Sequence, residues 1–203
     1  MRPGANLVRI DMTQIRRVWY AAYGSNTNAA RFHCYLRGGR PDGGARDHPG
    51  CRDTSPPVDT KAFWLPGSVY FAGTSTVWGG GMAFYDPATS GLVPARGWLI
   101  TVPQLADLIT QEMHEEPGHR PDLEHRVRAI VGHPGVGTHP LGMGRYETLV
   151  TTRSLDGMPV VTFTARHAHP RHQRTQPGNR YLATISAGLA EVGHRQGTAA
   201  PVL

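Results

Sequence analysis

Cysteine, charged residues and long hydrophobic runs are all scarce in this chain of 203 residues. The two cysteines, Cys34 and Cys51, are too few for a disulfide framework. No apolar run approaches the length of a membrane-spanning helix. Residues 1–17 carry several charges and no apolar core, unlike a secretory signal. Together these absences predict a soluble, cytoplasmic protein.

The composition predicts a compact core that carries long, structured loops. Hydrophobic residues make up 39% and charged residues 18%, both low for a globular protein, because 25 glycines and 17 prolines take their place. The length suits one domain. We expect tails at 1–16 and 196–203 and a single domain at 17–195, with loop insertions at 37–59 and 115–144.

The formal net charge of +6 permits binding to nucleic acid or to anionic substrates. The basic residues are mostly arginines scattered through loop-like segments, without a basic stripe that interleaves with aromatic residues. A basic nucleic-acid-associated module is therefore only an alternative interpretation, and nucleic acid is not the expected partner. A monomer and a homodimer both remain open.

Strand-like segments dominate the chain and predict an α+β fold, built on a small β-barrel or a strongly curved mixed sheet with flanking helices. The predicted strands are 17–23, 61–65, 68–72, 82–85, 93–100, 146–152 and 159–164. Pro66-Gly67 and Asp156-Gly157 are the turn signals between successive strands. The predicted helices are 28–36, one that begins at Thr101 with a capping box to Gln104, 123–131 and 179–193. The expected buried stripe of the last helix is Leu182, Ile185, Leu189 and Val192.

The first strand ends abruptly in a polar loop, Tyr23-Gly24-Ser25-Asn26. A tight loop before a helix exposes backbone N–H groups, and that geometry suits a carboxylate or a phosphate. An ordinary strand–turn–helix connection explains the same four residues, so the tetrapeptide alone does not decide between the two.

Glu112 is an acid on the apolar face of its predicted helix. It lies seven residues after Leu105 and four after Leu108, whereas Asp107 is expected on the solvated side. A carboxylate in a buried stripe is costly unless it is paired or lines a cavity. Glu112 is thus a candidate general base. The alternative is that it lies at a frayed helix end, or that it pairs with a basic neighbour such as His114.

Histidine and cysteine do not form a recognisable metal site in the sequence. The segment with His167, His169 and His172 has no neighbouring carboxylate or cysteine and is more typical of a solvated basic loop. It could also attract an acidic substrate at a pocket mouth. A second group matches no standard zinc spacing and consists of His33, Cys34, His48 and Cys51. We therefore expect no metal.

Four motifs occur in an order that resembles the gamma-glutamylcyclotransferase-like superfamily. They are Tyr23-Gly24-Ser25-Asn26, Trp78-Gly79-Gly80-Gly81-Met82-Ala83, Gly97-Trp98-Leu99-Ile100 followed by Leu105, Leu108 and Gln111-Glu112, and Gly144-Arg145-Tyr146. The resemblance covers residues 18–164. Residues 35–57, with Gly-Gly-Ala-Arg and Pro-Gly-Cys-Arg-Asp, resemble an actinobacterial branch of that group.

The resemblance implies both a chemistry and the residues that perform it. The signature loop would hold the α-carboxylate of a gamma-glutamyl group. Glu112 would take a proton from the α-amino group, which attacks the γ-carbonyl, closes 5-oxoproline and expels an amine. The expected partner is a small-molecule gamma-glutamyl-type amide, and the reaction needs neither a metal nor a cofactor. The implied substrate-binding residues are Tyr23, Gly24, Ser25, Asn26, Trp78, Gly80 and Tyr146.

Some features depart from the family pattern. Met113 stands where the family often has glycine, and the loops 37–59 and 115–144 are long. Both loops could wall the pocket and admit a larger or different substrate. Tyr146 could hydrogen-bond the substrate or simply pack. The main alternative is a non-catalytic small-molecule-binding domain, which a pocket filled by Met113 or by an insertion would favour.

Overall fold

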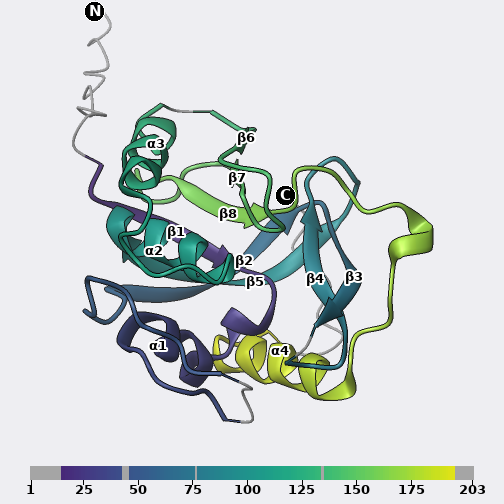
Figure 1. The fold of residues 1–203 in the computed structure, drawn as a ribbon. Coiled ribbons are helices and arrows are strands. Elements are labelled where there is room, and N and C mark those ends of the chain that lie inside the picture. Colours follow the sequence, from purple (N-terminus) through teal and green to yellow (C-terminus); the bar gives the residue numbers. More distant parts are fainter. Residues whose placement is uncertain (1–14, 43–45, 76, 134, 195–203) are drawn as a thin grey trace, which may run out of the picture.

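The computed structural model describes residues 15–42, 46–75, 77–133 and 135–194. The tail expected at 1–16 lies outside these residues except for its last two positions, and the tail expected at 196–203 lies wholly outside them. Helices and strands are present together, which confirms the α+β class (Figure 1). None of the described helices has the length and apolarity needed to cross a bilayer.

The centre of the fold is a mixed six-stranded sheet with the strand order β2-β5-β1-β8-β7-β6. Its strands are β1 (Arg17–Ala22), β2 (Asp59–Pro66), β5 (Leu92–Thr101), β6 (Gly137–Pro140), β7 (Thr148–Thr151) and β8 (Val160–Thr164). β1 runs antiparallel to β5 and parallel to β8. Within the described residues β2 and β6 form open edges, so the curved mixed sheet is confirmed and the closed barrel was wrong.

β3 (Ser68–Ser75) and β4 (Gly80–Asp86) form a two-stranded sheet separate from the main one. β3 pairs antiparallel with β4 and not with the preceding strand. The chain leaves the main sheet at the predicted turn, where Gly67 has a φ of 127°, a value that suits glycine. The predicted Asp156-Gly157 turn between β7 and β8 is also confirmed, with φ values of 52° and 74°.

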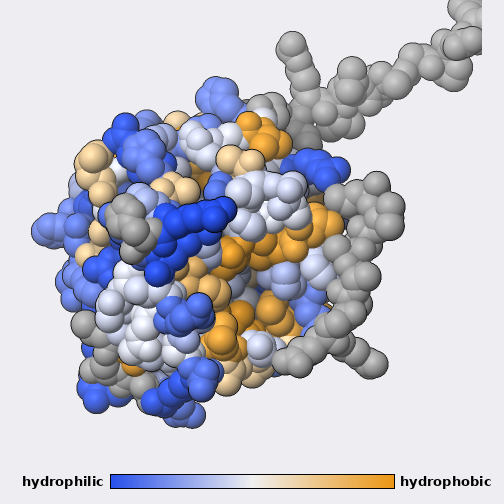
Figure 2. All heavy atoms as spheres, turned by 90° about the vertical axis from the view of Figure 1, so that its right-hand side faces the viewer, coloured by the Kyte–Doolittle hydropathy of each residue, from blue (hydrophilic) through white to orange (hydrophobic). Residues whose placement is uncertain are grey.

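A long segment, which we call the 165–178 strap, connects β8 to the last helix. In Figure 1 it passes around the outside of the β3–β4 hairpin. Its Thr175 N–H donates to the Phe71 carbonyl at 3.1 Å, and Arg174 forms a β-bridge with Ala72. Seen from this side, hydrophobic residues gather in a hollow that hydrophilic residues surround (Figure 2).

The helices flank the sheet and place the ends of several elements near one another. They are α1 (Ala29–Arg37), α2 (Val102–Glu112), α3 (Pro121–Val131) and α4 (Asn179–Glu191), together with the short 3-10 helices η2 (Ser25–Thr27) and η3 (Arg171–Gln173). The predicted capping box of α2 is confirmed, because the Thr101 hydroxyl accepts from Gln104 N–H and the Gln104 side chain accepts from Thr101 N–H at 3.0 Å.

The buried face of α4 differs from the predicted stripe. Leu182 is 39% exposed, whereas Tyr181 and Gly188 are buried. A Cβ on Gly188 would overlap the backbone of Thr27 and Asn28. α4 therefore packs closely on the η2 loop through a glycine and a tyrosine. Of the expected stripe, Ile185 packs against the core, Leu189 and Val192 are half-buried, and only Leu182 was wrong.

β1 is buried on both faces. Val18, Tyr20 and Ala22 pack in one hydrophobic cluster, and Trp19 and Ala21 pack in another. A strand that is covered on both sides is apolar without alternation, which is the pattern of this segment. The polar loop that follows β1 therefore begins in the middle of the core.

Candidate functional site

A pocket of about 220 Å³ lies where the most distinctive sequence features meet. Its walls come from the end of β1, the η2 loop, α1, β4, the end of α2 and the loop 37–59. No described residue of the loop 115–144 lines it, so only one of the two long loops takes the expected place. Seven of the eight predicted site residues line it, among them Tyr23, Gly24, Ser25, Asn26, Trp78 and Glu112. Tyr146 lines the pocket as well, and Gly80 does not.

The η2 loop is held in place from below by side chains of β5. The Trp98 indole N–H donates to the Asn26 carbonyl at 2.9 Å, and Arg96 donates to the Thr27 carbonyl at 3.0 Å. Gly24 has an ordinary extended φ of −104°, so its backbone does not require glycine. A Cβ there would lie 3.1 Å from the Tyr181 hydroxyl, so a larger residue would push the tip of that side chain away slightly. The two hydrogen bonds from β5 thus anchor the loop as one wall of the pocket.

Glu112 and Asn26 face each other in the pocket although 86 residues separate them. The Asn26 side-chain amide donates to a Glu112 carboxylate oxygen at 3.4 Å. Asn26 is 5% exposed, and its Oδ1 accepts no hydrogen bond from the described residues. A buried carbonyl oxygen without a donor is costly, so the site offers an acceptor for a ligand N–H beside the carboxylate.

Arg31 is a site residue that the sequence reasoning missed. It is 9% exposed, and its Nε donates to the Ser25 hydroxyl at 2.8 Å. The guanidinium lies 5.0 Å from the centroid of the Trp78 ring and 5.6 Å from that of Tyr35. Among the described residues no carboxylate lies within ion-pair distance of it. A signal was present, since Arg31 and Tyr35 are four residues apart and share one helix face.

An uncompensated buried charge is unfavourable, so a bound anion would stabilise the buried guanidinium of Arg31. Planar guanidinium groups suit carboxylate and phosphate. The η2 loop and Arg31 together therefore form an anion-binding corner next to the Glu112–Asn26 pair.

Tyrosine rings make much of the remaining wall. The hydroxyls of Tyr23 and Tyr146 donate to the carbonyls of Phe163 and Ala83, each at 2.9 Å. Burial raises the pKa of both hydroxyls well above its usual range, and it raises the pKa of Tyr181 to about 12. These phenols stay protonated at neutral pH, and the donors of Tyr23 and Tyr146 are used by the backbone. Of the two roles left open for Tyr146, the geometry favours packing.

Gly80 does not occupy its predicted place. It has a φ of 130°, and a Cβ there would lie 2.7 Å from the Gln176 carbonyl oxygen in the 165–178 strap. The triple glycine therefore allows the strap to approach β4 closely, and Gly80 is corrected from a substrate contact to a packing position. Trp78, at the start of the same motif, lines the pocket.

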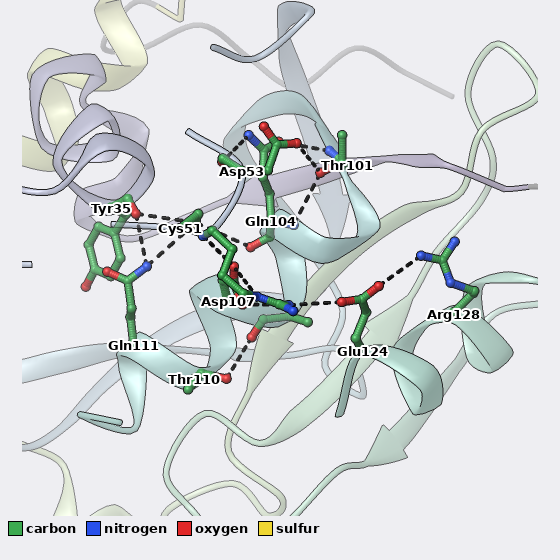
Figure 3. Close-up of polar contacts among 12 residues, drawn as sticks. Tyr35, Cys51, Asp53, Thr101, Gln104, Asp107, Thr110, Gln111, Glu124 and Arg128 are labelled. Atoms are coloured by element: carbon green, nitrogen blue, oxygen red, sulfur yellow. Dashed lines mark hydrogen bonds and ion pairs between the residues drawn. The ribbon is translucent and has the colours of Figure 1, made fainter. Parts of the chain in front are cut away.

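The loop 37–59 is fixed to α2 by a polar network (Figure 3). The backbone N–H of Arg52 donates to the Asp107 carboxylate at 2.9 Å, and the Arg52 guanidinium also binds Glu124 at 2.9 Å. Asp107 is 1% exposed, so its predicted solvated position was wrong. Gln111, next to Glu112, donates to the Tyr35 carbonyl at 3.0 Å. The network sets the position of the last turn of α2, where Glu112 lies.

Two histidines of the basic segment, His167 and His169, do not line the pocket. His169 packs on Phe84 with the ring centroids 4.5 Å apart and hydrogen-bonds Tyr70, while the side chain of His172 is outside the described part of the chain. Burial lowers the pKa of His169. In the described ranges, no three side chains of the types His, Cys, Asp and Glu are placed to hold a metal ion.

Comparison with known proteins gives few and partial likenesses. No family model matches the chain. Histone deacetylase 5 of Arabidopsis thaliana is 36% identical over 205 residues, which cover 95% of this chain and 31% of that protein. The chain thus spans about a third of the length of this relative.

Two solved structures are similar at low identity. One is an uncharacterized protein from Homo sapiens, with 17% identity and a TM-score of 0.49 over 88% of this chain and 81% of that one. The other is a gamma-glutamyl cyclotransferase, with 16% identity and a TM-score of 0.44 over 87% of this chain and 80% of that one. Likeness at this level does not assign an activity.

Proposed function

We propose that this protein belongs to the gamma-glutamylcyclotransferase-like superfamily and releases an amine from a gamma-glutamyl-type amide by internal cyclisation. The observation that carries the proposal is the contact between Glu112 and Asn26, which joins the end of α2 to the loop after β1 in one pocket. Two motifs that lie far apart in the sequence thus supply a base and an anchored binding loop. A cytoplasmic location, in keeping with two cysteines that form no disulfide, belongs to the same proposal.

The chemistry of the walls supports a gamma-glutamyl head group. Such a group carries an α-carboxylate and an α-amine on one carbon. Arg31 and the η2 loop suit the carboxylate, since the guanidinium is buried and lacks a carboxylate partner among the described residues. The Asn26 Oδ1 and the Glu112 carboxylate are adjacent acceptors for the N–H groups of the amine.

The reaction that follows is balanced within the substrate. The neutral α-amine attacks the γ-carbonyl carbon, and a new C–N bond closes the five-membered ring. Glu112 accepts the proton that the attacking nitrogen loses and returns it to the departing nitrogen as the original amide C–N bond breaks. The products are 5-oxoproline and a free amine. Because the nucleophile is tethered to the electrophile, positioning supplies much of the rate acceleration.

Every atom of both products comes from the substrate, so the balance of the step needs no redox partner and no added water. The protein has to hold the head group, exclude competing water and move one proton. The pocket has room for a ligand, because Met113 packs against Gly144 and does not line it. Met113 therefore does not fill the pocket, and a pocket filled by Met113 was the condition that would favour a non-catalytic binding domain.

The experiment is release of 5-oxoproline from a panel of gamma-glutamyl amides by the wild type, by Glu112→Gln and by the exposed control Glu116→Gln. Removing the base is expected to lower kcat by about 10² to 10⁴, while Glu116→Gln retains full activity. Equal activity of Glu112→Gln and wild type would refute the assignment of the base. Binding of an amide by the wild type without any 5-oxoproline would favour the binding-domain alternative.

A further inference from the structure

A groove of about 400 Å³ lies between the end of α3 and the strand β6, which are close together in Figure 1. The described residues that line it are Ala129, Ile130, His133, Gly135, Val136 and His139. None of them lines the pocket that contains Glu112, so the groove is a separate feature of the surface. We call Ala129, Ile130 and Val136 its apolar wall. Val136 is 75% exposed, so the described residues leave this wall largely uncovered.

The strand beside the groove, β6, is an open edge of the main sheet in the described part of the chain. Alternate residues of such a strand direct their N–H and C=O groups away from the sheet, and natural proteins cover or blunt these edges. The strand β2 at the other edge carries Lys61, which forms ion pairs with Asp59 and Asp156. The sequence of β6, Gly-Thr-His-Pro, contains no carboxylate, lysine or arginine. The edge at β6 is therefore the one that lacks charge protection.

The described chain begins beside this groove. Ile15 packs against the hydrophobic core, and its carbonyl accepts from the Arg128 guanidinium at 3.4 Å. Ile15 also lines a small cleft together with Val131, His133 and Gly135. Since His133 and Gly135 line the groove as well, the point at which residue 14 joins the fold lies next to it.

The sequence that precedes Ile15 has the pattern of a strand with one apolar face. Apolar and polar side chains alternate strictly over residues 8–13: Val8, Arg9, Ile10, Asp11, Met12 and Thr13. A period of two indicates a half-buried strand and not a helix. Residues 8–14 extend over at most about 25 Å, and a strand of the length of β6 extends over about 13 Å. The segment is therefore long enough to run along β6 from Ile15.

We propose that residues 8–13 add to the main sheet as a further edge strand on β6 and place Val8, Ile10 and Met12 against the apolar wall of the groove. The backbone of the segment pairs with the outward N–H and C=O groups of β6, and its polar side chains remain in water. This inference is independent of the proposed function, because the groove and the pocket have no lining residue in common.

Hydrogen exchange of single backbone amides, measured by NMR on the full chain, tests the added strand. β7 protects only those N–H groups of β6 that point towards it. Without a further strand, at least one amide among Gly137, Thr138 and His139 points outward and exchanges as fast as a loop amide. With the added strand all three are protected, which is the result expected for the wild type.

Two substitutions disturb the contact from opposite sides. Met12→Asp in the segment and Val136→Asp in the apolar wall each place a carboxylate in the groove. Each is expected to speed exchange of the outward amides of β6 by about 10-fold or more, since burial of one aliphatic side chain changes an equilibrium constant by about that factor. The amides that point towards β7 stay protected, which shows that the variant is folded. Thr13→Asp, on the polar face beside Met12, and Val58→Asp, at a site that is 59% exposed, are the controls and keep wild-type exchange.

Several results would overturn the inference. One is rapid exchange of an outward amide of β6 in the wild type, and another is an equal effect of Met12→Asp and Thr13→Asp. Protection that disappears on dilution, together with a dimer in size-exclusion chromatography, would show that a second copy of the chain covers the edge instead. Release of 5-oxoproline is expected to be the same in Met12→Asp and the wild type, so a failure of the proposed function leaves the exchange result unchanged.

Discussion

Replacing Arg31 separates a role in binding from a role in stability more sharply than any other change in the pocket. Its guanidinium is buried, donates to Ser25 and lies over two aromatic rings, yet it has no carboxylate partner in the described structure. A group placed for the fold would be paired within the fold. A group placed for a ligand gains its anionic partner only when the ligand binds. The structural explanation predicts that Arg31→Met lowers the stability of the fold, and the binding explanation predicts that it raises KM.

The expected magnitudes come from the contacts. Arg31→Met loses one hydrogen bond, worth about 0.5–1.5 kcal/mol, and cation–π contacts worth about 0.5–2 kcal/mol. It also removes a buried charge whose desolvation costs several kcal/mol. These terms oppose each other, so the free energy of unfolding should change by no more than about 1 kcal/mol. Loss of the charge-assisted contact to a substrate carboxylate, about 1.5–3 kcal/mol, lowers kcat/KM by about 10- to 150-fold, mostly through KM.

The assays are urea denaturation and steady-state release of 5-oxoproline from the best gamma-glutamyl amide. Arg31→Lys restores the charge without the planar stacking and should recover part of the loss in KM. Arg37→Gln, an exposed position at the end of the same helix, is the control and should change neither quantity. A loss of more than about 3 kcal/mol in stability with an unchanged KM would refute the reasoning, because Arg31 would then be structural.

Three further predictions concern the supports of the pocket. Gly188→Ala forces a methyl group into the Thr27 backbone, so urea denaturation should show a loss of about 1–3 kcal/mol, together with lower activity. Asp107→Asn weakens the contact to Arg52, whose side chain is 46% exposed, so the same measurement should show a smaller loss of about 1–2 kcal/mol. His48 has a folded-state pKa of about 4, below the ordinary 6.5, so the unfolded chain binds the extra proton and stability falls as the pH drops from 6.5 towards 4. Between pH 7 and pH 5 the wild type should lose about 2 kcal/mol more than His48→Gln, and equal losses would contradict the burial of a neutral ring.

Local patterns predicted the elements that carry the site. The apolar run of β1, the capping box at Thr101 and the turn at Asp156-Gly157 each depend on neighbours in the sequence, and the structure has all three. The position of Glu112 followed from helical periodicity. That Glu112 meets Asn26 could be expected only through the family resemblance, because no local rule relates residues 86 positions apart.

The failures arise where tertiary contacts override a local pattern. Asp107 looked solvated on its helix, but the loop 37–59 folds back and covers it with Arg52. Leu182 was expected in the buried stripe of α4 but is exposed, and Gly188 is buried instead, because close approach to the η2 loop decides which face is covered. Gly80 looked like part of a binding loop and instead admits the 165–178 strap. Each of these partners lies more than 50 residues away along the chain.

Arg31 was missed for a different reason. An arginine in the first turns of a short helix is an ordinary surface residue by composition, and only the aromatic rings that enclose it reveal its role. The same holds for His48 and Arg46, which line the pocket from a glycine-rich loop with no periodic pattern. Substrate specificity is therefore the least predictable part of the site, because the residues that would set it come from loops.

The central claim is that the substrate's own amine, and not water, attacks the γ-carbonyl. Turnover of a gamma-glutamyl amide in water enriched in oxygen-18, followed by mass spectrometry, tests it directly. The account predicts 5-oxoproline without the heavy isotope, together with the free amine, and loss of this product in Glu112→Gln. Glutamate with one heavy oxygen in its γ-carboxylate would contradict it, since that product requires attack by water.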